Sequence, residues 1–162
     1  AGALISFDPN LRKPLWKSMD DAKDKIIYGL SQCDILKISD DEIAFMMGTD
    51  DIRKGVNRLI DEYHIPFICA TMGKNGSMAF FDGQVVEAAP FLRDDTIETT
   101  GAGDTFCACL LHDILEHGIE KRNADDVKEM LTFANAAASL ITTRKGALCV
   151  MPEKAEVESL IR

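Results

Sequence analysis

The residues best suited to chemistry lie in the segment 99–106, TTGAGDTF. Gly101 and Gly103 flank an alanine, so the backbone there can approach a ligand without a bulky side chain between them. If a helix begins in this segment, its free N–H groups and the positive end of its dipole form a socket for an anion, most often phosphate. Asp104 would then lie in the first helical turn, where a carboxylate can take a proton from a hydroxyl that attacks phosphorus.

The spacing of these residues supports a purely structural interpretation of the segment equally well. Asp104 can simply complement the helix dipole, and the glycines can simply cap the helix. An isolated G-x-G is weak evidence, and this one is neither a Walker A loop nor a dinucleotide-binding fingerprint.

Strands alternate with helices along the rest of the chain. Short apolar runs predict buried strands at 3–7, 35–38 and 66–71, and Asp82-Gly83 predicts a hairpin between 77–81 and 84–87. Helical spacing and cap signals predict helices after Ser18, over 39–47 and 51–63, from the glycine segment to His117, over 124–142, and after Pro152. This alternation predicts an α/β fold with a mainly parallel sheet and helices on both faces.

Composition narrows the function classes. The 162 residues include 18 Lys and Arg and 27 Asp and Glu, a net charge of −9 that argues against a nucleic-acid binder. We expect no membrane span and no signal peptide, because no apolar run is long enough for either. The 5 cysteines lack metal-site spacing, so we expect free thiols and a cytoplasmic location.

Several segments, in the same order along the chain, resemble motifs of the ribokinase/PfkB carbohydrate kinases. Segment 98–106, ETTGAGDTF, resembles the family's signature D-T-T-G-A-G-D-T-F. The others are 37–42 (KISDDE), 71–77 (TMGKNGS), 133–138 (FANAAA) and 143–147 (TRKGA). Segment 8–12 (DPNLR), followed by PLW at 14–16, is similar to fructokinases within the family.

The resemblance implies a three-layer α/β/α, ribokinase-like fold and an ATP-dependent kinase acting on a sugar's primary hydroxyl. Asp104 matches the catalytic base, and the amides of Gly101, Ala102 and Gly103 match the anion hole that holds the transferring phosphoryl group. Glu42 matches the acidic residue that organises Mg²⁺, and a capping-box carboxylate is the alternative for it.

Further matches concern the nucleotide and the sugar. The positions matching the nucleotide site are Thr71, Gly73, Gly76, Asn135 and Lys37. Asn135 could instead serve helix packing. Arg12 matches an arginine that contacts phosphate or sugar, and a surface ion pair is the alternative.

The sequence departs from the family pattern in two ways. Glu98 replaces the usual Asp, and segment 146–152 (GALCVMP) lacks a hydroxyl side chain, which argues against the K⁺ site of many relatives. A K⁺ site formed by backbone carbonyls is the alternative. Family members are also about twice as long, so we expect residues 1–162 to be one C-terminal portion that lacks the N-terminal half and its lid. Such a portion alone should bind nucleotide weakly and phosphorylate little sugar, and we expect the full-length parent to be a homodimer.

The substrate rests on the subtype resemblance. Fructose is the first expectation. A kinase of 2-keto-3-deoxygluconate or another sugar acid is the alternative, in which case Arg12 would meet a carboxylate; a nucleoside kinase fits less well. The rival from another class is a non-catalytic nucleotide-binding module, against which the intact G-A-G-D segment argues.

Overall fold

Five strands form one sheet in the computed structural model, which describes residues 2–162 apart from the Leu148 side chain. The strands are β1 (Ser6–Phe7), β2 (Ile35–Ser39), β3 (Phe67–Thr71), β4 (Ser77–Phe81) and β5 (Gln84–Ala88), and their order in the sheet follows the chain. β1, β2 and β3 are parallel, with Ser6 opposite Ile35 and Leu36 opposite Ile68. A two-residue turn with positive φ at both Asp82 and Gly83 joins β4 to β5, which makes these two strands an antiparallel hairpin.

The contacts divide the described chain into two units. The first contains the residues up to Thr71 together with Phe80–Gln84, and the second contains Met72–Ala79 and Val85–Arg162.

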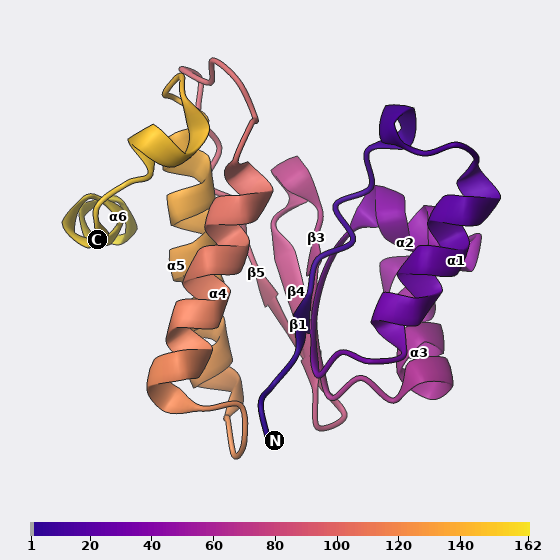
Figure 1. Ribbon diagram of the computed structural model, residues 1–162. Helices are drawn as coiled ribbons and strands as arrows, with labels where there is room; N and C mark the ends of the chain where they lie inside the picture. Colours follow the sequence, from indigo (N-terminus) through magenta and orange to yellow (C-terminus); the bar gives the residue numbers. More distant parts are fainter. Residues whose placement is uncertain (1) are drawn as a thin grey trace. The chain divides into compact units, whose positions relative to one another are not determined.

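The first unit is built from β1–β3 and three helices, which are α1 (Met19–Leu30), α2 (Asp40–Met47) and α3 (Ile52–Tyr63). In Figure 1 these helices lie on one side of β1–β3. The fully buried side chains of these helices include Leu30, Ile43 and Leu59, and those of β2 and β3 include Leu36, Ile38 and Ile68. Parallel strands need apolar residues on both faces, which explains why β2 and β3 are almost continuously buried.

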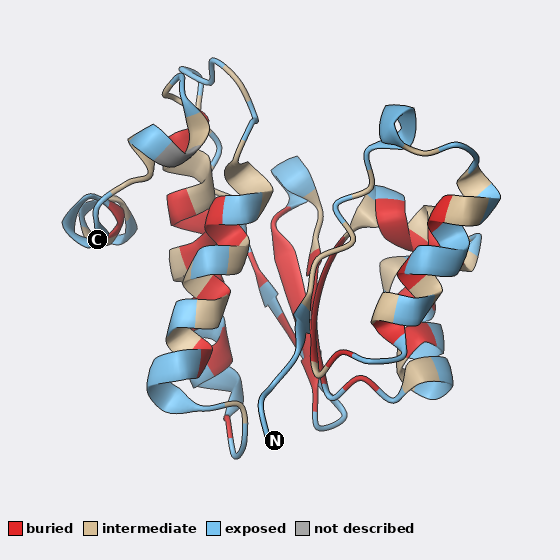
Figure 2. Cartoon of the chain, in the orientation of Figure 1, coloured by how far each residue is buried: buried red, intermediate tan, exposed pale blue. Residues whose placement is uncertain are grey.

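The second unit is dominated by α4 (Ala102–His117), α5 (Ala124–Ile141) and the shorter α6 (Lys154–Ile161). α4 and α5 run side by side, and Figure 2 shows buried positions along both helices. Val157 of α6 is buried in one cluster with Ala136 and Ala137 of α5. Among the described residues, no helix is both long and apolar enough to span a membrane.

Local sequence signals are confirmed at several helix ends. The Ser18 side chain accepts the Asp21 N–H at the start of α1, and Ser39 and Glu42 form the expected capping box of α2. Gly48 ends α2 in the left-handed conformation. The α/β class and the parallel arrangement of β1–β3 are therefore as predicted.

The first predicted strand is wrong in extent and in burial. β1 contains only Ser6–Phe7, while Leu4 and Ile5 are 53% and 48% exposed. β1 is at the end of the strand order, so it has only one neighbouring strand, and an edge position leaves flanking residues uncovered.

Candidate functional site

The N-terminus of α4 is formed by the glycine segment. Gly101 is the N-cap residue with φ 84°, a left-handed conformation that glycine adopts at no steric cost, and no side chain caps the helix. The first intrahelical bond runs from the Thr105 N–H to the Gly101 carbonyl at 2.8 Å. The N–H groups of residues 101–104 precede this bond and have no acceptor within the helix. Among them, the Ala102 N–H donates to the Thr99 carbonyl at 3.2 Å.

Asp104 occupies the first turn of α4 and is exposed. Its carboxylate is therefore accessible beside backbone N–H groups at the positive end of the helix dipole. The helix start in the glycine segment and the place of Asp104 in the first turn are as predicted, while the anion socket stays a prediction.

The end of α5 and the chain beyond it hold the glycine segment in place. The Thr142 carbonyl accepts the N–H groups of Ile97 and Glu98 at 2.8 and 3.2 Å. Glu98 Oε1 in turn accepts the Gly146 N–H at 3.3 Å. A Cβ on Gly101 would lie 3.2 Å from Cδ1 of Ile141, so the loop packs closely against α5.

A charged cluster occupies the carboxyl ends of β1 and β2 in the first unit. Lys37 Nζ lies 3.2 Å from Oδ2 of Asp8, and both side chains are largely buried, at 8% and 17% exposed. Glu42 accepts two backbone N–H groups, from Leu11 to Oε1 at 2.7 Å and from Ser39 to Oε2 at 2.9 Å. Parallel strands end at the same edge of the sheet, which is why residues so far apart in sequence meet here.

Burial raises the pKa of Asp8 above its ordinary value, because desolvation disfavours the charged carboxylate. Lys37 opposes this shift through its charge and its hydrogen bond, while Glu42 adds to it by repulsion. The poorly solvated Asp8 carboxylate is thus stabilised by Lys37 and by the Asn10 N–H, which donates to Oδ1 at 3.1 Å.

The two remaining predicted residues of the first unit are more open. Arg12 is exposed, and no described residue forms an ion pair with it, so the structure gives no support to the surface-pair alternative. Thr71 ends β3, is partly buried and lies opposite Ser39 in the parallel register.

In the second unit, Gly76 and Asn135 meet at the end of β5. A Cβ on Gly76, which has φ +87°, would lie 2.2 Å from the Ala88 carbonyl oxygen. Asn135 Nδ2 donates to the carbonyls of Ala88 and Ala89 at 3.3 and 3.0 Å. This use of the amide matches the packing alternative for Asn135. Gly73 has φ +51° and open space around it.

The model of the pfkB family carbohydrate kinases matches residues 1–154. The chain belongs to this family. Fructokinase from Klebsiella pneumoniae is 38% identical over 160 residues, covering 98% of this chain and 51% of that protein. Probable fructokinase-4 from Arabidopsis thaliana is 33% identical over 162 residues, covering 100% of this chain and 49% of that protein.

A solved fructokinase structure shares the fold. A crystal structure of Vibrio cholerae fructokinase with fructose, ADP and calcium ion matches with a TM-score of 0.85 and 27% identity, over 98% of this chain and 51% of that one. This chain thus spans about half the length of these three fructokinases.

Two residues that the sequence analysis did not name as site residues are Asp8, in the charged cluster, and Thr142, beside the glycine segment. Asp8 is part of the motif at 8–12 and directly follows a strand at the carboxyl edge of a parallel sheet, and these were the available signals for it. Thr142 acts through its backbone carbonyl, which no sequence pattern could have indicated.

The described residues suit a Mg²⁺ ion that keeps most of its water ligands. Among the residues described, no group of three or more His, Cys, Asp or Glu could enclose a metal ion. Mg²⁺ is usually held by one or two carboxylates, with water and substrate phosphates completing its shell. Glu42, with both oxygens already accepting N–H groups, suits contact through water.

Proposed function

We propose that this chain is the catalytic and nucleotide-binding part of a carbohydrate kinase that transfers the γ-phosphoryl group of ATP to a primary hydroxyl of fructose. The observation that carries the proposal is the α4 N-terminus, where unpaired backbone N–H groups and the exposed carboxylate of Asp104 share one turn. Pairing an anion socket with a base is what phosphoryl transfer to a hydroxyl requires.

In the proposed reaction, Asp104 accepts the proton of the sugar hydroxyl as its oxygen attacks the γ-phosphorus. The bond from this phosphorus to the bridging oxygen breaks, and ADP leaves. The N–H groups at the start of α4 stabilise the charge on the transferring group, with those of Gly101, Gly103 and Asp104 more available than that of Ala102, which donates to Thr99.

The nucleotide would be held by the loop that contains Thr71, Gly73 and Gly76, and by Lys37. Asn135 keeps the packing role that its hydrogen bonds to Ala88 and Ala89 indicate. Glu42 would hold Mg²⁺ through water, and the ion when bound would neutralise charge on the phosphates. The proposal includes no K⁺, because segment 146–152 offers no hydroxyl side chain to bind the ion.

Substituting Asp104 in the full-length parent tests the proposal. Asp104→Asn should lower fructose-dependent ADP formation by roughly 10²- to 10⁴-fold and keep ATP affinity, because it removes the base and little else. Asp125→Asn, an exposed first-turn carboxylate of α5, is the matched control. Unchanged turnover in Asp104→Asn would refute the base, and an ATP-binding parent without turnover would favour the non-catalytic module.

The 162-residue chain alone should bind nucleotide weakly and phosphorylate little sugar. Full fructose-dependent turnover by this chain would refute the expectation that the sugar pocket lies outside it.

A sugar acid such as 2-keto-3-deoxygluconate is the second candidate substrate, and the exposed Arg12 favours it, because a guanidinium without an ion-pair partner suits a carboxylate. Arg12→Met in the parent should then raise KM for the keto acid far more than KM for fructose. Equal effects on both substrates would remove the sugar acid from consideration.

A further inference from the structure

The chain that leaves α5 forms a tight turn at residues 146–150, most of which is a short 3₁₀ helix, and this turn lies beside the start of α4. A Cβ on Gly101 would lie 3.4 Å from both Cα and Cβ of Ala147. The Gly146 N–H also donates to Glu98 Oε1 at 3.3 Å. The 146–150 turn therefore packs closely against the N-cap residue of α4 and is bonded to the glycine segment.

The backbone of the 146–150 turn is unusual, because two consecutive residues have positive φ. Gly146 has φ 132° and Ala147 has φ 46°. The left-handed conformation is costly for alanine, and it persists only where the surrounding structure holds it. One such contact lies within the turn, where the Cys149 N–H donates to the Gly146 carbonyl at 3.2 Å.

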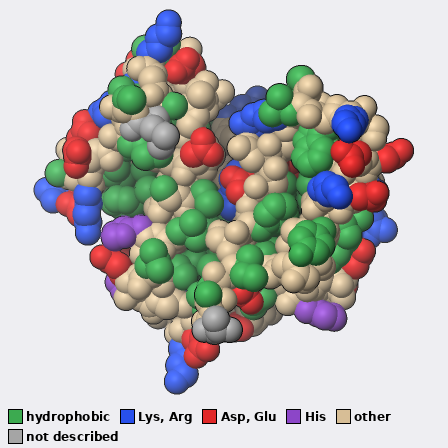
Figure 3. Space-filling view, viewed as in Figure 1, with side chains coloured by type: hydrophobic (Ala, Val, Ile, Leu, Met, Phe, Trp, Pro, Cys, Tyr) green, Lys and Arg blue, Asp and Glu red, His purple; other side chains and the backbone are tan. Residues whose placement is uncertain are grey.

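Arg144 holds the turn from outside. Its Nη1 donates to the Val150 carbonyl and to Glu156 Oε2, both at 3.3 Å, and its Nη2 donates to Glu156 Oε1. The guanidinium thus ties the end of the turn to α6, and it does so through a bidentate pair that fixes direction as well as charge. Figure 3 shows side chains of both charge signs intermixed at the surface over α6, so it is the geometry that distinguishes the Arg144–Glu156 pair.

α6 gives the Arg144–Glu156 pair a fixed point of attachment. Val157, next to Glu156, is 1% exposed and packs in one cluster with two alanines of α5. Glu156 Oε2 also accepts the Glu153 N–H at 2.8 Å, in the capping box at the start of α6. The hydrogen bond from Arg144 is the main reason why the pKa of Glu156 lies below its ordinary value.

We propose that Arg144 is a positioning residue for phosphoryl transfer, which holds the 146–150 turn against the N-terminus of α4 and so keeps the N–H groups of residues 101–104 aligned. It acts through the turn and not through contact with ATP or sugar. The inference rests on the proposed function, in which these N–H groups stabilise the transferring group. Because phosphoryl transfer depends mostly on positioning and charge stabilisation, a small displacement of the N–H groups lowers the rate.

Substitution of Arg144 in the full-length parent tests this role, with kcat expressed per ATP-binding site so that an unfolded fraction does not count. Arg144→Met should lower kcat for fructose-dependent ADP formation by roughly 5- to 30-fold and change KM for fructose by less than about twofold. Arg144→Lys should restore little of this loss, because an ammonium group cannot reproduce the forked donation to Val150 and Glu156. Glu156→Gln keeps one acceptor and should lower kcat by only about two- to fivefold.

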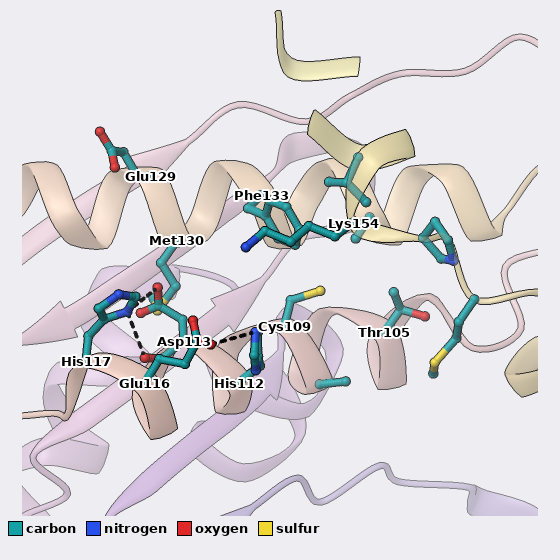
Figure 4. Close-up of a pocket in the computed structure, with 15 residues that line it drawn as sticks. Thr105, Cys109, His112, Asp113, Glu116, His117, Glu129, Met130, Phe133 and Lys154 are labelled. Atoms are coloured by element: carbon teal, nitrogen blue, oxygen red, sulfur yellow. Dashed lines mark hydrogen bonds and ion pairs between the residues drawn. The ribbon is translucent and has the colours of Figure 1, made fainter. Parts of the chain in front are cut away.

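Lys154→Met is the matched control, because it removes one positive charge from α6 without breaking the Arg144–Glu156 pair. Lys154 is the first residue of α6 and is exposed. In Figure 4 its side chain extends toward Phe133 of α5. Since charge alone has little effect at an exposed position, kcat should stay within about twofold of the unmodified parent.

Selective ¹⁵N-glycine labelling of the parent follows the position of the turn independently of activity. The backbone NMR signals of Gly101, Gly103 and Gly146 should shift in Arg144→Met and stay in place in Lys154→Met. Should Arg144→Met fail to fold, Glu156→Gln decides by the same measurements.

Three results would overturn the role of Arg144. They are an unchanged kcat in Arg144→Met, an equal loss of kcat in Arg144→Met and Lys154→Met, and glycine signals that do not move in Arg144→Met. An unmodified parent without fructose-dependent turnover would instead contradict the proposed function, and the glycine signals would still show whether Arg144 holds the turn.

Discussion

The charged cluster at the ends of β1 and β2 and the N-terminus of α4 use opposite means to place polar groups. In the first, Lys37, Asp8 and Glu42 are largely buried and already paired with one another or with backbone N–H groups. In the second, backbone N–H groups and an exposed carboxylate are left without partners within the helix. A cluster whose polar groups are all paired therefore contributes to folding. A helix end whose polar groups lack partners is available to a ligand.

The largest effect on stability should come from Lys37→Met. It leaves the Asp8 carboxylate buried without its counter-charge, which should lower the free energy of unfolding at pH 7 by roughly 2–4 kcal/mol. Urea denaturation measures this loss. Lys54→Met, at an exposed position of α3, is the control and should change little.

The pH dependence of the Lys37→Met effect has a definite sign. Burial already raises the pKa of Asp8 above 3.8, and removing Lys37 raises it further. The ionised carboxylate is then disfavoured by folding. The cost is therefore absent below the unfolded-state pKa, grows as the pH rises from there to the folded-state pKa, and is fully present above it. The loss should therefore be much smaller at pH 4 than at pH 7. An equal loss at both pH values would contradict the role of Asp8.

Glu42→Ala should be the next most damaging change. It removes the acceptor for the N–H groups of Leu11 and Ser39, at a cost of about 1–3 kcal/mol. Glu42→Gln keeps one carbonyl acceptor and should lose about half as much. If both variants unfold like the unmodified chain in urea, Glu42 is not a structural cap, and the cluster is less saturated than its hydrogen bonds imply.

Gly101→Ala tests the backbone of the unsaturated end. Gly101 and Gly48 both have positive φ, at 84° and 64°, but only Gly101 has side-chain atoms close to its missing Cβ. Gly48→Ala should cost about 1 kcal/mol for the left-handed conformation alone, and Gly101→Ala should cost about 1–2 kcal/mol because Ile141 lies in the way. Equal thermal unfolding of the two variants would show that the loop does not pack closely on α5.

Asp104→Asn should have the smallest effect on stability. The side chain is exposed and contributes only its favourable position at the helix N-terminus, so we expect a loss of less than about 1 kcal/mol. The matched change Asp125→Asn in α5 should cost a similar amount in the same denaturation experiment. A large loss for Asp104→Asn alone would mean that this carboxylate is structural and would weaken the contrast between the two regions.

The sequence could predict local features, because each of them depends on residues that are neighbours in the chain. The capping box at Ser39, the turn at Asp82-Gly83 and the start of α4 in the glycine segment each depend on a few consecutive residues, and all three are confirmed. Membership of the kinase family was also within reach, because its motifs are local and ordered.

What the sequence could not predict depends on contacts between distant residues. The pairing of Lys37 with Asp8 requires the parallel register of β1 and β2, and the Thr142 carbonyl meets Ile97 only after α5 has packed. The exposure of Leu4 and Ile5 likewise follows from the strand order. The sequence could not predict it, because an apolar run has the same pattern in an edge strand as in a central strand. For Asn135, a helix-interior amide gives no sign of which carbonyls it will meet.

The close approach of Gly76 to Ala88 limits how the proposed nucleotide loop, residues 71–76, can be redesigned. Every other amino acid carries a Cβ, and backbone rather than a movable side chain occupies that space, so a selection for altered nucleotide use should return glycine at this position in every surviving clone. Gly73, three residues earlier, has empty surroundings and a backbone conformation that asparagine tolerates. A library randomised at residues 73–76 should therefore accept several residue types at position 73 and only glycine at position 76.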